Sequence, residues 1–241
     1  MKLIDAARRL GAVEVISLKK ELQQRITSQP FGYLLVLDFE ATCWGQNEKT
    51  KRLPEIIEFP CVLYSIERDS IVSVFQQYVM PVENPMLTSF CTELTGIQQS
   101  QVDSGVPLQT CLMLFKKWLA NIKLEFHLSY DLSGTSKNKC IFSTWSDWDL
   151  GICLRNECRR KRIAIPDIFN AWIDARAMYR KHYLRRPKGL HGALCEVGLD
   201  FEGREHCGLD DARNTAKLIG KMIADGVLLE CTKNLSIKSG K

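Results

Sequence analysis

The stretch YLLVLDFE, residues 33–40, begins with five apolar or aromatic residues and ends with two acids one position apart. An uninterrupted run of this kind predicts a strand that is buried on both faces. Residues i and i+2 of a strand point to the same side, so Asp38 and Glu40 should leave the core together. Ionised carboxylates at a strand exit need water, partners or a cation. The pattern indicates either a solvated strand end or the beginning of a hard-metal site.

A second acidic segment, GREHCGLDDARNTA, occupies residues 203–216. The apolar residues at its end and beyond it recur at helical spacing, which places Asp210 or Asp211 in the first turn of a helix. His206 precedes that helix and is expected on the loop that enters it. An acid at a helix start can be a simple cap, and a single loop histidine can be a surface residue. The combination with Asp38 and Glu40 in this chain order favours a shared site.

The middle of the chain supplies a third acidic position. Residues 140–145 read as a buried strand, and residues 149–162 carry a helical apolar stripe. Asp149 is therefore expected at a strand-to-helix junction. Asp147 is the competing candidate, although it could serve only as a helix cap.

These motifs resemble a known family. Asp38-x-Glu40, Asp149 and His206-x4-Asp211 resemble the three exonuclease motifs of the DEDDh superfamily. Longer sequence segments resemble the 3′-to-5′ exoribonuclease branch, which contains the histone-mRNA exonuclease and the enhanced-RNAi nucleases. These segments are residues 38–44, 55–60, 94–97, 148–149 and 206–211. The resemblance spans residues 30–232 and is strongest to small, single-domain Snipper-type members.

The resemblance implies a fold class and an activity. The fold would be α/β, a ribonuclease H-like three-layer exonuclease fold with a mixed central sheet flanked by helices. The activity would be metal-dependent 3′-to-5′ hydrolysis of RNA, and of single-stranded DNA or 3′ overhangs, to 5′-mononucleotides. Two alternatives stay open: another two-metal phosphodiesterase such as an endonuclease, and a nucleic-acid-binding module with weak or no turnover.

By resemblance, four acids hold two Mg²⁺ ions, for which Mn²⁺ can substitute. Asp38 would bridge the ions, Glu40 and Asp211 would hold the ion beside the attacking water, and Asp149 would support the second ion. Oxygen ligands suit Mg²⁺, and two such ions can serve both ends of an in-line displacement. Glu40 and His206 are the catalytic candidates, with His206 taking the proton of the water, a role that histidine side chains commonly have in catalysis. His127, His182 and His191 are weaker candidates for that role.

The substrate contacts are expected to tolerate any base, because stacking and phosphate contacts do not read sequence. The predicted substrate-binding residues are Ala41, Thr42, Trp44, Leu94, Gly96, Trp148 and Lys188. Each tryptophan could instead be a core residue. Basic residues also cluster at 155–162 and 176–188, which indicates either a phosphate track or solvated helix ends.

Composition sets the remaining expectations. The 241 residues carry a net charge of +5, 45% hydrophobic residues and ten cysteines. No apolar run is long enough for a membrane span, and the charged N-terminus does not resemble a signal peptide. Reduced cysteines and an intracellular location, cytoplasm or nucleus, are therefore expected. We expect a monomer that binds single-stranded RNA or DNA 3′ ends.

The expected organisation is one domain with two extensions. Residues 1–30 form a lead-in helix or arm, residues 31–232 the exonuclease domain and residues 233–241 a flexible basic tail. Strands near 33–39, 59–66 and 71–79 should form an antiparallel meander. Helices are expected near 107–122, 149–162, 168–182, 189–197 and 210–225. The extra nucleic-acid-binding modules of longer relatives are not recognised, so stem-loop specificity is not expected.

Overall fold

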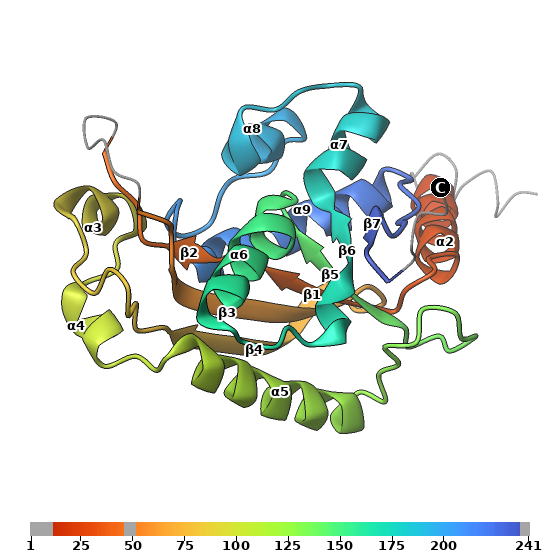
Figure 1. The fold of residues 1–241 in the computed structure, drawn as a ribbon. Helices are drawn as coiled ribbons and strands as arrows, with labels where there is room; N and C mark the ends of the chain where they lie inside the picture. The colour runs from red at the N-terminus through yellow and green to blue at the C-terminus, as the bar shows by residue number, and fades with distance from the viewer. Residues whose placement is uncertain (1–11, 46–51, 237–241) are drawn as a thin grey trace, which may run out of the picture.

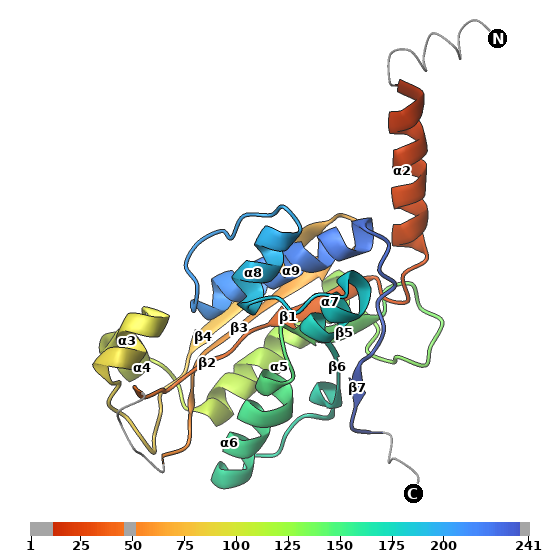
Figure 2. The same cartoon turned by 90° about the horizontal axis from the view of Figure 1, so that it is seen from above.

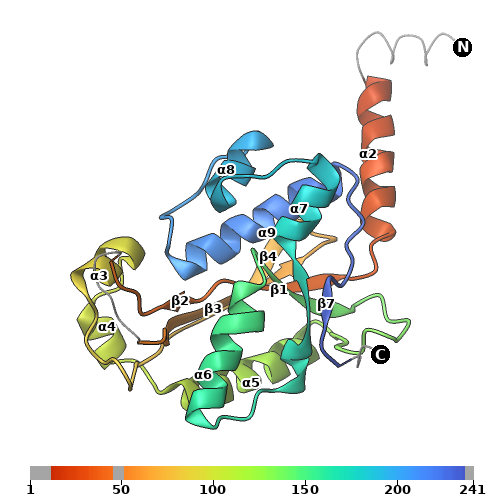
Figure 3. The same ribbon diagram turned by 45° about the horizontal axis from the view of Figure 1, so that its top comes forward.

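The computed structural model describes residues 12–45 and 52–236. In this part of the chain a seven-stranded mixed sheet lies between two layers of helices, as Figures 1 and 3 show. The helices α5 (Leu108–Glu125) and α6 (Leu154–Lys161) lie on one face of the sheet. The helices α7 (Ala175–Tyr183), α8 (Gly189–Glu196) and α9 (Gly208–Ala224) lie on the other. The predicted three-layer α/β fold is confirmed.

The sheet is built around β1 (Tyr33–Leu37), which pairs antiparallel with β3 (Ile56–Ser65) and parallel with β5 (Cys140–Thr144). The long strand β3 also pairs with β4 (Ser70–Tyr78) and with the two-residue β2 (Glu40–Ala41). The predicted meander of three antiparallel strands is confirmed, with β3 as its middle strand.

Alternate residues of β1 enter two separate cores, as its uninterrupted apolar run predicts. Leu35 and Leu37 pack into the core beneath α5 and α6, which also contains stacked and tilted aromatic rings around Phe115. Leu34 and Val36 pack into the core beneath α7, α8 and α9. Because both faces of β1 are covered, its carboxyl end is a fixed platform for the residues that follow it.

The second half of the chain corrects one prediction. The helix expected near 168–182 is instead a 3₁₀ turn (Asp167–Asn170), the strand β6 (Ala171–Asp174) and then α7. β6 extends the sheet parallel to β5, and its fully buried Trp172 and Ile173 supply one side chain to each core. A strand of four residues is too short for its alternation to be told from a helical stripe.

Several short elements were not predicted. The helices α3 (Ser89–Thr95) and α4 (Gln99–Asp103) follow β4 and cover the end of the sheet near β2. The strand β7 (Lys233–Asn234) pairs antiparallel with β6. The sheet therefore continues past residue 232, the predicted end of the domain, and residues 237–241 of the predicted tail lie outside the described residues.

A helix, α2 (Ala12–Thr27), lies within the predicted N-terminal arm, and residues 1–11 lie outside the described part of the chain. Figure 2 shows that α2 extends away from the body. Its end is held by Arg25, whose guanidinium donates to the carbonyl of Ala224. Gln29 donates to the Val227 carbonyl at 2.9 Å and accepts from the Leu229 N–H at 3.0 Å. The base of the arm is thus hydrogen-bonded to the segment after α9. Among the helices of the described residues, none is both long and apolar enough to cross a bilayer.

Candidate active site

Two of the predicted acids lie at the carboxyl ends of neighbouring parallel strands. Asp38 follows β1. Asp149 lies five residues after the end of β5, in a π-helical turn (Trp148–Cys153). Parallel strands bring their carboxyl ends to the same edge of a sheet. The Asp149 Oδ1 accepts the N–H of Phe39 at 2.8 Å, so it also fixes the backbone between Asp38 and Glu40. The competing candidate Asp147 instead accepts from the Trp172 indole at 3.0 Å.

Glu40 is placed by the two-residue strand β2. It is buried and lies opposite Glu58 of β3 in the antiparallel register. Glu58 does not enter the cavity described below; its Oε2 accepts the N–H of Gly208 at 3.0 Å. A glutamate at the start of a helix interacts favourably with the helix dipole, so Glu58 ties the first turn of α9 to the central sheet.

Asp211 is brought to the site by close packing of the first turn of α9. A Cβ at Gly208 would lie 2.5 Å from the Asp38 carbonyl oxygen and 3.2 Å from Glu58 Oε2. Only glycine permits that approach without displacement of the backbone. Asp211 is therefore carried toward Asp38 although 173 positions separate them in the sequence.

The three carboxylates converge. One ligand oxygen from each of Asp38, Glu40 and Asp211 lies within 4.8 Å of the other two. Asp149 does not belong to this trio, although its charge is the second cause, after burial, that raises the pKa of Asp38. The predicted set of four acids is thus assembled as a trio with a buried, hydrogen-bonded fourth member.

The environment of these acids disfavours their charged forms and raises their pKa values. Burial, and then the Asp211 and Glu58 carboxylates, raise the pKa of Glu40 to about 9. Burial raises the pKa of Asp149 and of Asp211 to about 7, although each accepts a backbone N–H that favours its charged form. Hard oxygen donors under mutual repulsion are a donor set that fits divalent cations of the magnesium type.

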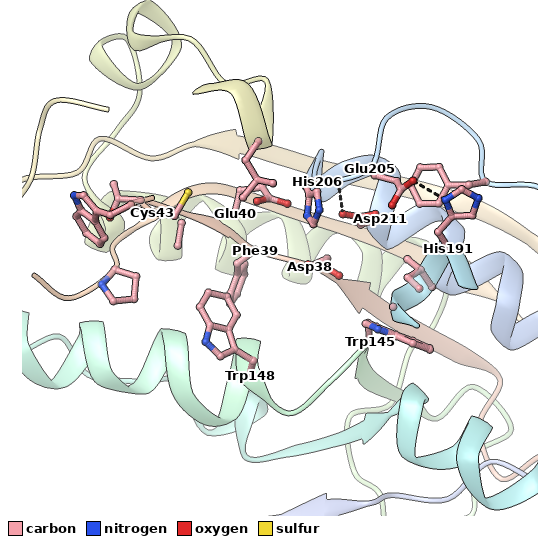
Figure 4. A pocket seen from close by; sticks show the side chains of 18 of the residues that line it. Asp38, Phe39, Glu40, Cys43, Trp145, Trp148, His191, Glu205, His206 and Asp211 are labelled. Carbon is pink, nitrogen blue, oxygen red and sulfur yellow. Dashed lines mark hydrogen bonds and ion pairs between the residues drawn. The ribbon is translucent and has the colours of Figure 1, made fainter. Parts of the chain in front are cut away.

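His206 lies on the loop before α9, as predicted, and its side chain reaches the cavity beside Glu40 and Asp211 (Figure 4). Its backbone N–H donates to Asp211 Oδ2 at 3.0 Å. Its φ of 60° lies in the left-handed region, which is uncommon for a residue other than glycine. The loop therefore holds His206 in a constrained conformation next to the carboxylates.

A cavity of about 810 Å³ surrounds these groups. Most of the predicted substrate-binding residues line it: Ala41, Thr42, Trp44, Leu94, Trp148 and Lys188. Trp148 is 37% exposed and so presents its ring to solvent. Thr42 has a structural bond as well, because its hydroxyl accepts the Glu55 N–H at 3.0 Å.

Gly96 was predicted to line the site, and the structure places it elsewhere. It is not part of the cavity wall; the Arg204 side chain packs against it, with Cζ 2.8 Å from the position of a Cβ. The absence of a side chain at this position makes room for an arginine of the protein.

Several cavity residues were missed. Trp145 and Phe201 add aromatic rings to the wall, and His191 and Glu205 form a hydrogen bond there with 2.5 Å between Nδ1 and Oε1 (Figure 4). Trp145 ends a predicted strand beside Asp149, which is the one signal that could have found it. The pairing of His191 with Glu205 leaves no local trace in the sequence.

The first basic cluster is largely used inside the protein, contrary to a phosphate track. Lys161 bridges the buried carboxylates of Glu55 and Glu157 at 2.7 and 2.6 Å. Arg160 donates to the Pro54 carbonyl at 2.9 Å, and Arg155 donates to the Phe169 carbonyl at 3.0 Å. These three basic residues of the 155–162 cluster therefore attach this helical segment to neighbouring parts of the protein.

Comparison with protein families matches residues 35–219 to the family described as Exonuclease. The chain belongs to this family, and the resemblance drawn from its motifs is confirmed. It is 48% identical to ERI1 exoribonuclease 2 of Xenopus laevis over 95% of the chain and 34% of that protein. It is 45% identical to the 3′-5′ exonuclease Snipper of Drosophila melanogaster over 96% of the chain and 84% of that protein. The chain thus spans about a third of the vertebrate relative and most of the fly relative.

Solved structures of related nucleases share this fold. The nuclease domain of 3′hExo, titled a DEDDh family member bound to rAMP, is 34% identical with a TM-score of 0.74, covering 85% of this chain and 98% of that one. Cell-death related nuclease 4 is 30% identical with a TM-score of 0.69, covering 82% and 65%. The predicted ribonuclease H-like fold is confirmed, and so is membership of an exonuclease family.

Proposed function

We propose that this domain is a metal-dependent 3′-to-5′ exonuclease that shortens RNA, and single-stranded DNA or 3′ overhangs, to 5′-mononucleotides. One observation carries the proposal: the oxygens of Asp38, Glu40 and Asp211 converge within 4.8 Å in a cavity that His206 and Trp148 also line. Convergent hard ligands, a histidine and an exposed aromatic ring together suit hydrolysis of a terminal phosphodiester.

Asp38, Glu40 and Asp211 are the proposed direct ligands of two Mg²⁺ ions, with Asp149 supporting the second ion and Mn²⁺ able to substitute. When bound, these ions would lower the pKa of the attacking water and offset charge on the leaving 3′-oxygen. The raised pKa values of the four acids support this assignment, because a bound cation would offset their burial and, at Asp38, Glu40 and Asp211, the repulsion by neighbouring carboxylates.

His206 is the proposed general base. A ring nitrogen of His206 would take the proton of the attacking water, a role for which a side chain with a pKa near neutrality is suited. The hydrogen bond from the backbone N–H of His206 to Asp211 Oδ2 supports this role, because it couples the position of the histidine to that of a proposed ligand carboxylate. Glu40 would assist as a ligand of the ion beside the attacking water.

The terminal nucleotide is proposed to be held without base reading. Trp148, Trp44 and Leu94 offer apolar surface for the base, the backbone at Ala41 and Thr42 lies beside the carboxylates, and Lys188 offers a cation to the phosphate chain. The relatives support RNA as a substrate, since their names include exoribonuclease and one structure is titled with the histone mRNA stem-loop.

We further propose that the domain works as a monomer inside the cell, in cytoplasm or nucleus. All ten cysteines, each within the described ranges, are free thiols, which supports a reducing compartment.

The test is a timed digestion of 5′-labelled single-stranded RNA and its DNA equivalent, with Mg²⁺ or a chelator. A metal-dependent ladder that shortens from the 3′ end, and that Asp38→Ala abolishes, is the expected result. Discrete internal fragments would instead indicate an endonuclease, and binding without shortening would indicate a binding module. A duplex with a 3′ overhang beside a blunt duplex tests the requirement for a single strand.

A further inference from the structure

The loop that carries His206 is attached to a distant helix by Arg204. The Nη2 of Arg204 donates to the carbonyl of Glu93 at 2.6 Å and lies 3.5 Å from the carbonyl of Leu94. Both carbonyls belong to the last turn of α3, where helical carbonyls lack partners within the helix. A guanidinium there satisfies open acceptors and complements the negative end of the helix dipole.

The backbone of α3 leaves a place for this guanidinium at Gly96. Gly96 follows the helix with a φ of +77° and donates its N–H to the Thr92 carbonyl, so it ends the helix in the left-handed conformation. A Cβ at this position would lie 2.8 Å from the Arg204 Cζ and closer still to Nη1. Glycine at position 96 therefore serves two purposes: a left-handed helix end, and a surface on which Arg204 can lie flat.

The remaining bonds of the loop make Arg204 its attachment to α3. The Arg204 N–H donates to Asp210 Oδ2 and the Cys207 N–H donates to the Arg204 carbonyl, both within the loop and its helix. Glu205 binds His191 of α8. Arg204 thus contacts α3, and the next residue, Glu205, contacts α8. The side chain of His206 projects into the cavity beside Asp211 (Figure 4).

We propose that Arg204, seated on Gly96, is a positioning residue for His206, which rests on the general-base role proposed above. Arg204 does not line the cavity. Arg204 holds the loop in the conformation in which His206 has its left-handed backbone and its ring stays beside Glu40 and Asp211. Misplacement of a reacting group by about 1 Å can cost about 100-fold in rate, so a link of this kind can matter to turnover without touching substrate.

A role limited to fold stability predicts something different. Arg204 is exposed, and exposed charge contacts contribute little to the free energy of unfolding. The proposal therefore predicts that Arg204→Ala lowers kcat by about 10–100-fold, with KM within about two-fold and the melting temperature nearly unchanged. Arg68→Ala, at an exposed arginine in the β3–β4 turn, is the matched control and should keep wild-type kinetics. A change in KM alone, or no change in kcat, would overturn the proposal.

A second variant tests whether Arg204 acts through the histidine. In a His206→Ala background, Arg204→Ala should add no more than about a two-fold loss, because effects of residues that act as a unit are not additive. A full additional loss would show that Arg204 acts elsewhere and would contradict the proposal.

Gly96→Ala completes the test through a double-mutant cycle. The strain of a left-handed alanine is present with or without Arg204, so it cancels in the cycle. Gly96→Ala should lower kcat at least ten-fold when Arg204 is present and add little in the Arg204→Ala background. Equal losses in both backgrounds would mean that the guanidinium does not need the glycine.

One readout does not depend on activity. Arg204→Ala should speed hydrogen exchange of the backbone amides of residues 203–207 relative to wild type and Arg68→Ala, and unchanged exchange would overturn the proposed attachment. If Arg204→Ala exchanges faster than wild type, but wild type does not shorten RNA from its 3′ end, the proposed function fails while the attachment stands. If shortening is normal and exchange is unchanged, the attachment alone fails.

Discussion

At the scale of single residues, the position of the Asp38 carboxylate destabilises the folded, metal-free protein. Burial and four neighbouring carboxylates raise its pKa well above the ordinary value, so its charged form is disfavoured whenever no cation is bound. We expect Asp38→Asn to leave the melting temperature of the metal-free protein equal or higher, because it removes a repelled charge. The same change should abolish turnover.

Two measurements separate these effects. Thermal unfolding in the presence of a chelator reports the stability, and titration calorimetry with Mg²⁺ reports the loss of metal binding. A large fall in the metal-free melting temperature would show that the Asp38 carboxylate stabilises the fold, contrary to its burial and its repulsion by Asp149 and Asp211.

The general-base role proposed for His206 leads to a different prediction, because a base moves a proton and does not bind the ions. His206→Ala should lower kcat by about 10²–10⁴-fold, the usual scale for a lost general base, with Mg²⁺ affinity kept. Single-turnover hydrolysis at saturating RNA measures the chemical step. His182→Ala, an exposed histidine on α7, is the control. An unchanged single-turnover rate would remove His206 from this role.

At the scale of elements, the site depends on how closely the first turn of α9 approaches β1. Gly208→Ala would place a methyl group 2.5 Å from the Asp38 carbonyl and 3.0 Å from the Pro60 ring. Overpacking of this kind costs about 1–3 kcal/mol, and it should also displace Asp211. We expect a lower melting temperature together with at least a ten-fold weaker response to Mg²⁺, measured as the metal concentration for half-maximal hydrolysis.

The matched control is Gly192→Ala within α8, where the nearest atom to a new Cβ is 3.5 Å away. Alanine is favoured over glycine by up to about 1 kcal/mol in a helix interior. This variant should be as stable as wild type or more stable, with an unaltered metal response. Equal behaviour of the two variants would mean that close packing at Gly208 does not position Asp211.

The elements that could be predicted are those whose pattern is long or unambiguous. β1 was recognisable because an apolar run ends in Asp38-x-Glu40, and α9 because its stripe covers more than four turns. β6 was missed because Ala171–Asp174 is short and lies between helical patterns. α3 and α4, of seven and five residues, carry too few turns for a periodicity to be seen.

The convergence of the proposed metal ligands and His206 was predictable because their motifs lie at the ends of patterned elements. The Arg204–Gly96 contact was not, because it joins two loops 108 positions apart in the sequence. The sequence left the role of the basic cluster at 155–162 open for a related reason: charge alone does not reveal that Lys161 is enclosed by Glu55 and Glu157. Contacts decided by tertiary packing leave little local signal.

At the scale of the whole molecule, the acidic centre links stability to pH and to metal. The pKa values of Glu40, at about 9, and of Asp149 and Asp211, at about 7, lie above the ordinary range near 4. A carboxyl whose folded pKa is raised favours the folded state below its unfolded pKa. That contribution is lost as pH rises through the folded pKa. The metal-free protein should therefore lose stability between about pH 4 and pH 9.

Divalent metal should reverse this loss, because its ligands must be deprotonated and the bound cation compensates their charge. We expect the gain in melting temperature on adding saturating Mg²⁺ to be larger at pH 8 than at pH 6. We also expect Mg²⁺ binding at pH 7 to release protons, measured by calorimetry in buffers of different ionisation enthalpy. The double variant Asp38→Asn, Glu40→Gln should show a flatter pH profile and no proton release. A metal-free protein that becomes more stable from pH 6 to pH 8 would contradict the electrostatic account of the site, since its four acids could not then be repelling one another.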